Sequence, residues 1–98
     1  MVSQLRMYKV KAGALEAFVR EWRAGVVPLR RKFGFKVEGA WALPERNEFV
    51  WILAYDGPEG FEARDAAYYA SPERKALTPD PARHLTQIDT RLMRSVLP

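Results

Sequence analysis

The sequence of 98 residues contains no cysteine, which excludes disulfides, iron–sulfur clusters, cysteine-ligated zinc sites and thiol catalysis. It also lacks a long hydrophobic run, because the longest apolar stretch, residues 49–55, is far too short to span a bilayer. The first residues do not have the basic, apolar and small-residue regions of a signal peptide. We therefore expect a soluble protein of the cytoplasm that does not contact a membrane.

Motifs of several enzyme classes are missing as well. There is no Gly-x-Ser-x-Gly nucleophile turn, no phosphate-binding loop with its lysine and no dinucleotide-binding glycine pattern. Acylphosphatases need a glycine-rich anion loop after the first strand, and residues 11–14 do not supply one. The sequence thus offers no motif that identifies a reaction.

The single histidine, His84, lies where a proline-rich loop meets the last predicted strand. As a general base or a haem ligand it would have to enter the mouth of a pocket. One histidine without neighbouring ligand residues does not form a metal site. The pattern favours a solvated loop histidine, with His84 kept as a catalytic candidate, and we expect neither a metal nor a cofactor.

Charge is only mildly unbalanced. Sixteen Lys and Arg against 12 Asp and Glu give a net charge of +4. Basic residues gather on or beside one predicted helix, where glutamates separate them: Arg20, Arg23, Arg30, Arg31, Lys32 and Lys36. This pattern is typical of a solvated helix face. Because the aromatic and glycine signature of RNA-recognition domains is absent, nucleic-acid binding is not favoured.

The length and the hydrophobic fraction of 48% predict one domain, residues 1–98. Hydrophobic periodicity and the positions of glycine and proline predict the following order. Strands are expected over residues 3–10, 35–43, 48–55 and 85–96, with helices over residues 14–32, after residues 56–59 and over 71–77. Pro28 should kink the first helix or start a new turn, and Gly34 should end it. Asp56 or Gly57 is the expected cap of the second helix.

This β-α-β-β-α-β order predicts an α+β, ferredoxin-like fold, in which two helices cover one face of an antiparallel sheet. The third strand is apolar on both faces. We expect its larger side chains on the face without helices, together with Tyr8: Phe49, Trp51, Leu53 and Tyr55. Such a patch is unfavourable in water, so the pattern predicts a homodimer with sheets packed face to face. The barrel-like space between them is either a pocket or a filled core.

Several short motifs resemble, in their order, those of the NIPSNAP family. The first strand carries Leu5-Arg6-Met7-Tyr8, followed by Gly13, and the helix has Phe18, Trp22 and Pro28. Later segments add Gly34-Phe35, Gly39-x-Trp41, Asn47, Tyr55, Arg64 and Ser71-Pro72-Glu73. The sequence departs from the family at Ala12, where proline is usual, and at Arg74, where tryptophan is frequent. The resemblance implies a dimeric α+β barrel, a superfamily that includes cofactor-free monooxygenases, isomerases and haem proteins.

Arg6 and Tyr8 share one strand face and are the main candidates for a site. An arginine fork and a phenol in a semi-apolar pocket could hold a carboxylate or an enolate. Asp89 could orient Arg6, whereas Trp41, Trp51 and Tyr55 could line the pocket or stack on a flat ligand. The alternative is structural, with Arg6 in an ion pair and the aromatic residues as ordinary core.

Two hypotheses follow for function. The leading one is a homodimer that binds a small, flat, anionic organic molecule in the barrel. If it is an enzyme, the expected chemistry is cofactor-free oxygenation or isomerisation, with Arg6 and Tyr8 stabilising an oxyanion and His84 as the base. The alternative is a non-catalytic protein-interaction module whose barrel is filled by side chains.

Overall fold

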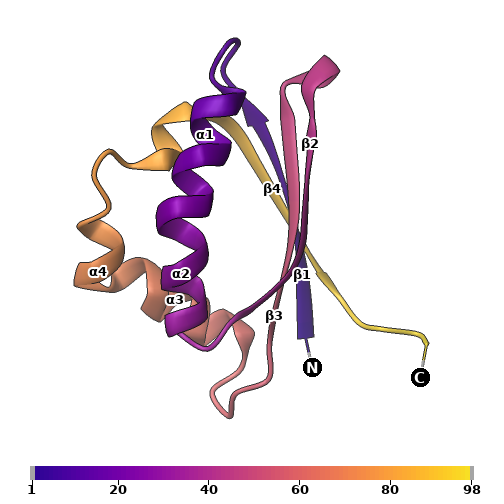
Figure 1. Ribbon diagram of the computed structural model, residues 1–98. Helices are drawn as coiled ribbons and strands as arrows, with labels where there is room; N and C mark the ends of the chain where they lie inside the picture. Colours follow the sequence, from indigo (N-terminus) through magenta and orange to yellow (C-terminus); the bar gives the residue numbers. More distant parts are fainter. Residues whose placement is uncertain (1, 98) are drawn as a thin grey trace.

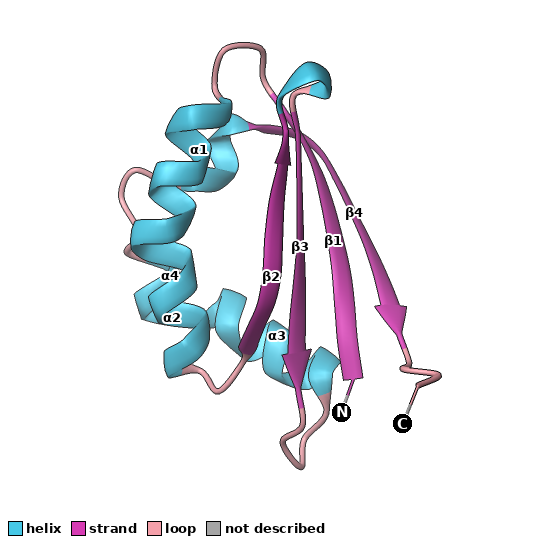
Figure 2. Ribbon diagram, turned by 45° about the vertical axis from the view of Figure 1, so that its right-hand side comes forward, coloured by secondary structure: helices cyan, strands magenta, loops and turns pink. Residues whose placement is uncertain are grey.

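The computed structural model describes residues 2–97 and has the predicted order of elements. The strands are β1 (Val2–Val10), β2 (Lys36–Leu43), β3 (Glu48–Tyr55) and β4 (Leu85–Met93). The helical elements are α1 (Leu15–Glu21), η1 (Trp22–Val26), α2 (Val27–Lys32), η2 (Pro44–Arg46), α3 (Phe61–Ala70), α4 (Pro72–Lys75) and η3 (Pro81–His84). The strands form one antiparallel sheet in the order β2-β3-β1-β4, which confirms the α+β, ferredoxin-like prediction (Figure 2).

The first helix is continuous in space but changes its winding before the proline. The five residues of η1 are π-helical, and the amide of Val27 donates to the carbonyl of Trp22, five residues earlier. Because Pro28 cannot donate a backbone hydrogen bond, a wider turn just before it leads into α2 without breaking the helix. Gly34 follows with φ of +91°, so the predicted glycine stop is confirmed.

The second helix begins after residues 56–59, as expected, but the prediction that Asp56 or Gly57 caps it is wrong. The helix α3 begins at Phe61 with Gly60 at its N-cap position, because residues 57–60 form a turn in which the amide of Gly60 donates to the carbonyl of Gly57 at 3.2 Å. Gly60 has φ of +87°, a left-handed conformation from which no helix can extend backwards. The short helix expected over residues 71–77 is present as α4, and the amide of Arg74 donates to Ser71 Oγ at 3.1 Å at its start. The strand β4 ends at Met93, three residues earlier than expected.

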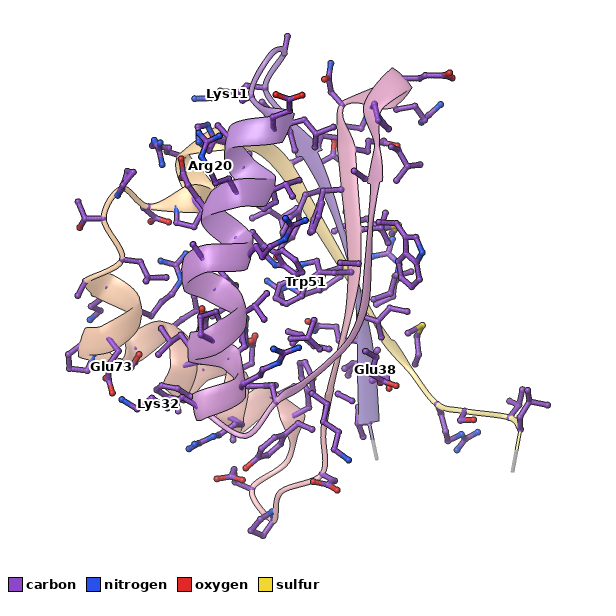
Figure 3. All side chains as sticks on the ribbon, viewed as in Figure 1. Lys11, Arg20, Lys32, Glu38, Trp51 and Glu73 are labelled. Carbon is purple, nitrogen blue, oxygen red and sulfur yellow. The ribbon has the colours of Figure 1, made fainter. Side chains whose placement is uncertain are left out.

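All the long helices cover the same face of the sheet (Figure 1). The core lies between these layers and is mostly aromatic, with Phe18 and Trp22 of the helices packed on β3. Phe49, Trp51 and Leu53, each at most 2% exposed, point into this core, and Figure 3 shows Trp51 between helix and sheet. The prediction that they lie on the face without helices is therefore wrong.

The large side chains of β3 face the helices and not the open side of the sheet for a physical reason. Strand alternation defines which residues share a face, but it does not say which face the helices cover. Both faces of β3 are apolar, so the sequence pattern is satisfied by either choice. The structure places the large rings where the helices can enclose them fully, because burying more apolar area stabilises the fold more.

Within residues 2–97 the opposite face of the sheet carries no helix (Figure 1). The register places Leu5 and Met7 of β1 beside Val50 and Ile52 of β3, and all four are only partly buried. Trp41 of β2 lies opposite Val50 and is 55% exposed. An exposed apolar patch on the open face of the sheet was also the reason for expecting a second copy of the chain to pack there, although other residues form the patch.

No helix of the described part of the chain has the length and apolar character needed to cross a membrane.

Candidate functional site

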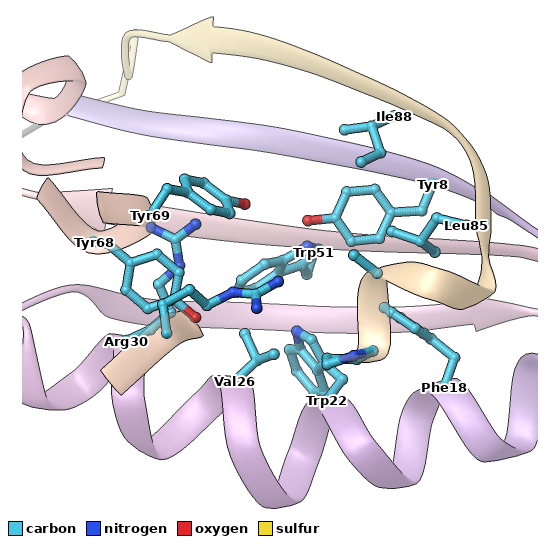
Figure 4. Close-up of a pocket in the computed structure, with 13 residues that line it drawn as sticks. Tyr8, Phe18, Trp22, Val26, Arg30, Trp51, Tyr68, Tyr69, Leu85 and Ile88 are labelled. Carbon is cyan, nitrogen blue, oxygen red and sulfur yellow. The ribbon is translucent and has the colours of Figure 1, made fainter. Parts of the chain in front are cut away.

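A cavity of about 160 Å³ lies between the helices and the sheet, toward β4. Its wall is largely aromatic and includes side chains from every layer (Figure 4). The lining residues are Tyr8, Phe18, Trp22, Val26, Arg30, Trp51, Tyr68, Tyr69, Arg74, Pro81, Ala82, Leu85 and Ile88. An apolar cavity of about 150 Å³ holds one benzene ring, so this space suits a ligand of about one ring.

Arg6 lies behind the cavity wall and is 4% exposed. Its Nε donates to Tyr8 Oη at 2.8 Å, one terminal nitrogen donates to Gln4 Oε1 at 2.6 Å, and the other donates to Tyr69 Oη at 2.7 Å. None of these partners is a carboxylate. The buried guanidinium therefore has no counter-ion among its hydrogen-bond partners, an arrangement that attracts an anion.

The protonation states at this cluster follow from burial and charge. Burial lowers the pKa of Arg6, but the oxygens of Tyr8 and Tyr69 outweigh it and raise the pKa above its ordinary value. Burial raises the pKa of Tyr8, and the Arg6 guanidinium opposes only part of this effect. At neutral pH the cluster is thus a charged guanidinium holding a protonated phenol at Tyr8.

Arg30 is a second buried arginine and is fully enclosed, with 0% exposure. One terminal nitrogen pairs with Asp65 Oδ1 at 2.7 Å, and the guanidinium carbon lies 3.7 Å from the ring centre of Tyr68. The expectation that Arg30 belongs to a solvated helix face is wrong. The burial of Arg30 could have been predicted from the sequence, because Trp22, Val26 and Arg30 recur at intervals of four on the buried side of the helix.

Four buried polar atoms have no hydrogen-bond partner in the described structure, and all belong to residues that line the cavity: Trp22 Nε1, Arg30 Nε, Trp51 Nε1 and Tyr68 Oη. Each unpaired buried donor costs roughly 1–3 kcal/mol. All four groups can donate a hydrogen bond. A ligand with acceptor atoms would satisfy donors that the chain leaves unpaired.

Three of the residues singled out from the sequence meet at this site. Tyr8 and Trp51 line the cavity, with ring centres 6.3 Å apart, and Arg6 lies over both rings. Sequence reasoning missed Arg30, Tyr69 and the other wall residues from α3, α4 and η3. Their contribution depends on helix packing and loop closure, for which the local pattern carries no signal.

The remaining candidates lie elsewhere. Trp41 and Asp89 are on the open face of the sheet, because they pair across the strands with Val50 and Met7. Asp89 accepts a hydrogen bond from Gln87 and cannot orient Arg6, so that expectation is wrong. Tyr55 is on the helix side but lies at the far end of β3, packed on Phe35, with its hydroxyl donating to Glu59.

His84 does not line the cavity. Its Nε2 lies 3.2 Å from Glu21 Oε2, and Glu21 also accepts two hydrogen bonds from Arg83 at 2.6 and 2.9 Å. The histidine therefore has a carboxylate neighbour from α1, which the sequence around His84 does not predict. This cluster fastens η3, which forms part of the cavity wall, to the first helix.

Within residues 2–97 no group of three His, Asp or Glu side chains is placed to hold a metal ion.

Comparison with known proteins agrees with this fold. The NIPSNAP family model matches residues 3–97. The chain belongs to the NIPSNAP family. No curated protein matches the sequence.

Solved structures of the family share the architecture. An uncharacterized NIPSNAP domain protein from Burkholderia xenovorans has a TM-score of 0.84 at 20% identity, covering 98% of this chain and 95% of that chain. A NIPSNAP family protein with unknown function from Agrobacterium tumefaciens has a TM-score of 0.82 at 21% identity, covering 95% and 86%. An antibiotic biosynthesis monooxygenase has a TM-score of 0.72 at 17% identity, covering 99% and 100%. At these identities the likeness concerns the fold.

Proposed function

We propose that this NIPSNAP domain binds a small, flat, anionic organic molecule in the cavity between its helices and its sheet. The observation that carries the proposal is the set of unpartnered buried donors around a space of about 160 Å³. The site differs from the one expected between two paired sheets, because Arg6, Tyr8 and Trp51 all face the helices.

Charge supports an anion. Three guanidinium groups, those of Arg6, Arg30 and Arg74, lie at or behind the wall. Two carboxylates oppose them: Asp65, which pairs with Arg30, and the exposed Asp80, which pairs with Arg74 at 3.1 Å. The excess of positive charge in a partly desolvated space favours a monoanion over a neutral molecule of the same shape.

The chemistry that this cavity suits is the stabilisation of a negative oxygen by hydrogen-bond donors and positive charge. Cofactor-free oxygenation and isomerisation of an enol or an activated aromatic compound both pass through such an oxyanion. The likeness in fold to an antibiotic biosynthesis monooxygenase supports testing oxygenation first. The alternative stays a non-catalytic protein-interaction module in which the barrel between two paired sheets is filled by side chains.

Calorimetric titration with benzoate and with its neutral analogue benzyl alcohol tests the binding proposal. We expect benzoate to bind at least about tenfold more tightly, equivalent to about 1.4 kcal/mol. Ile88→Trp, at a half-exposed residue of the wall, should obstruct the cavity and abolish binding. Leu92→Trp is the matched control, since Leu92 has the same 51% exposure on the same strand but does not line the cavity.

Two outcomes would contradict the proposal. Equal affinity for the acid and the alcohol would show that charge plays no part. Equal binding by the Ile88→Trp and Leu92→Trp variants would show that ligands bind outside this cavity.

We propose further that the single domain functions as a homodimer, with the open sheet faces of two copies packed together. The partly exposed apolar patch around Val50 and Trp41 supports this arrangement. A cytoplasmic location, expected from the sequence, stays a prediction.

A further inference from the structure

Two phenols face each other across the cavity. Figure 4 shows the hydroxyl groups of Tyr8, on β1, and Tyr69, on α3, directed toward one another beside Trp51. Both hydroxyl oxygens accept hydrogen bonds from one guanidinium, that of Arg6, at 2.8 Å for Tyr8 and 2.7 Å for Tyr69. The pair is therefore held in place from behind by a single positive charge.

This geometry determines what the phenols can do. A phenol carries one proton, and its oxygen can accept and donate at the same time. Since each oxygen accepts from Arg6, each O–H is available for donation in another direction. No side chain or carbonyl of the described residues accepts a hydrogen bond from either hydroxyl. Two phenolic donors are thus available at the cavity wall, and a guanidinium that polarises a phenol makes it a stronger donor.

We propose that Tyr8 and Tyr69 form a two-phenol anion hole that binds the oxygen of a planar oxyanion, a phenolate or a carboxylate, whose ring lies against Trp51. The proposal rests on the proposed function. It adds which two residues bind the ligand and which ligand group, an oxyanion, they bind. Arg6 is a positioning residue, because it reaches the ligand only through the two hydroxyls.

Access to the site fits this assignment. Tyr8 is 6% exposed and forms the inner half of the pair, whereas Tyr69 is 42% exposed and lies at the border with solvent. A ligand entering beside Tyr69 would meet both donors without displacing the core. The competing location for an anion is the indole of Trp22, whose Nε1 is an unpartnered donor at the cavity wall.

The test uses 4-nitrophenol as the probe, because its phenol and phenolate forms differ in visible absorption and interconvert near neutral pH. Titration at several pH values yields separate dissociation constants for the two forms. We expect the wild-type protein to bind phenolate at least about tenfold more tightly than phenol, and Tyr69→Phe to weaken phenolate binding about tenfold or more while phenol binding changes little.

Tyr55→Phe is the matched control, because it removes a phenol hydroxyl from the same face of the sheet outside the cavity. It should bind both forms as the wild-type protein does. If Tyr69→Phe and Tyr55→Phe bind phenolate equally while Ile88→Trp abolishes binding, the anion hole is wrong and the cavity proposal stands. If neither form of the probe binds to the wild-type protein, both proposals are overturned.

Discussion

At the scale of single residues, Arg30 and Asp65 form an ion pair at 2.7 Å whose arginine is buried in the core. Arg30 is fully enclosed, and Asp65, whose side chain is 23% exposed, is the carboxylate that balances it. Removing one member of such a pair leaves a buried charge without a partner, which costs more than the pair itself contributes. The aromatic rings of Phe35 and Tyr68 around the guanidinium compensate for only part of this loss.

We therefore expect Asp65→Ala to lower the free energy of unfolding by about 3 kcal/mol. The double variant Arg30→Met, Asp65→Ala should recover much of the loss, because methionine needs no counter-ion. Glu73→Ala is the control, since its pair with Lys32 is exposed and should contribute at most about 0.5 kcal/mol. Urea unfolding measures all three, and a double variant less stable than Asp65→Ala would refute the uncompensated-charge explanation.

At the scale of elements, η3 depends on its attachment to α1. Glu21 holds this turn through Arg83 and His84, and Pro81 and Ala82 of the same turn line the cavity. The hydrogen bonds from Arg83 are the main cause that lowers the pKa of Glu21 from 4.5 to about 2, against the effect of burial, and the contact with His84 adds to it. The attachment is therefore sensitive to acid.

The sign of the effect follows from the lowered pKa. A carboxylate with a lower pKa in the folded than in the unfolded protein stabilises the fold above pH 4.5, and this stabilisation is lost as pH falls toward about 2. Thermal unfolding between these pH values should thus show a steeper loss of Tm in the wild-type protein than in Glu21→Gln. The same slope in both proteins would show that Glu21 does not carry the acid sensitivity.

At the scale of the whole molecule, the helices of the described residues cover one face of the sheet and leave the other open. The open face carries the half-buried side chains of Leu5, Met7, Val50 and Ile52, with Trp41 beside them. A partner of the same kind would bury this patch by packing sheet against sheet, and the helix-side cavity would stay within each copy. Binding and dimerisation are then separate properties of opposite faces.

Native mass spectrometry tests this arrangement and reports any retained ligand at the same time. We expect a dimer, and we expect Val50→Glu to give a monomer, because it would place an unpaired charge in the middle of the interface. Ile88→Glu is the control, since it introduces the same charge on the helix side of the sheet and should leave the dimer intact. A wild-type monomer would overturn the homodimer proposal.

Most of the fold could be predicted from local signals, but only a small part of the site, since Tyr8 and Trp51 are the predicted site residues that line the cavity. Strand alternation correctly placed Arg6 and Tyr8 on one face, because neighbours two apart in a strand always share a face. The prediction that Asp89 orients Arg6 is wrong for the same geometric reason. The register pairs Asp89 with Met7, so Asp89 lies on the opposite face of the sheet from Arg6. Most of the cavity wall comes from the helices and η3. Their packing against the sheet cannot be predicted from residues that are neighbours in the sequence.

The sequence by itself determined the order of elements, the bounds of β3 and the glycine stop at Gly34, because periodicity and backbone freedom act over a few residues. Only the tertiary structure decided which face of β3 the helices cover. It alone brought Arg6 to Tyr69, 63 positions later, and Arg30 to Asp65, 35 positions later. These contacts arise from packing of distant segments, which minimises exposed apolar area over the whole chain and not over any one stretch of it.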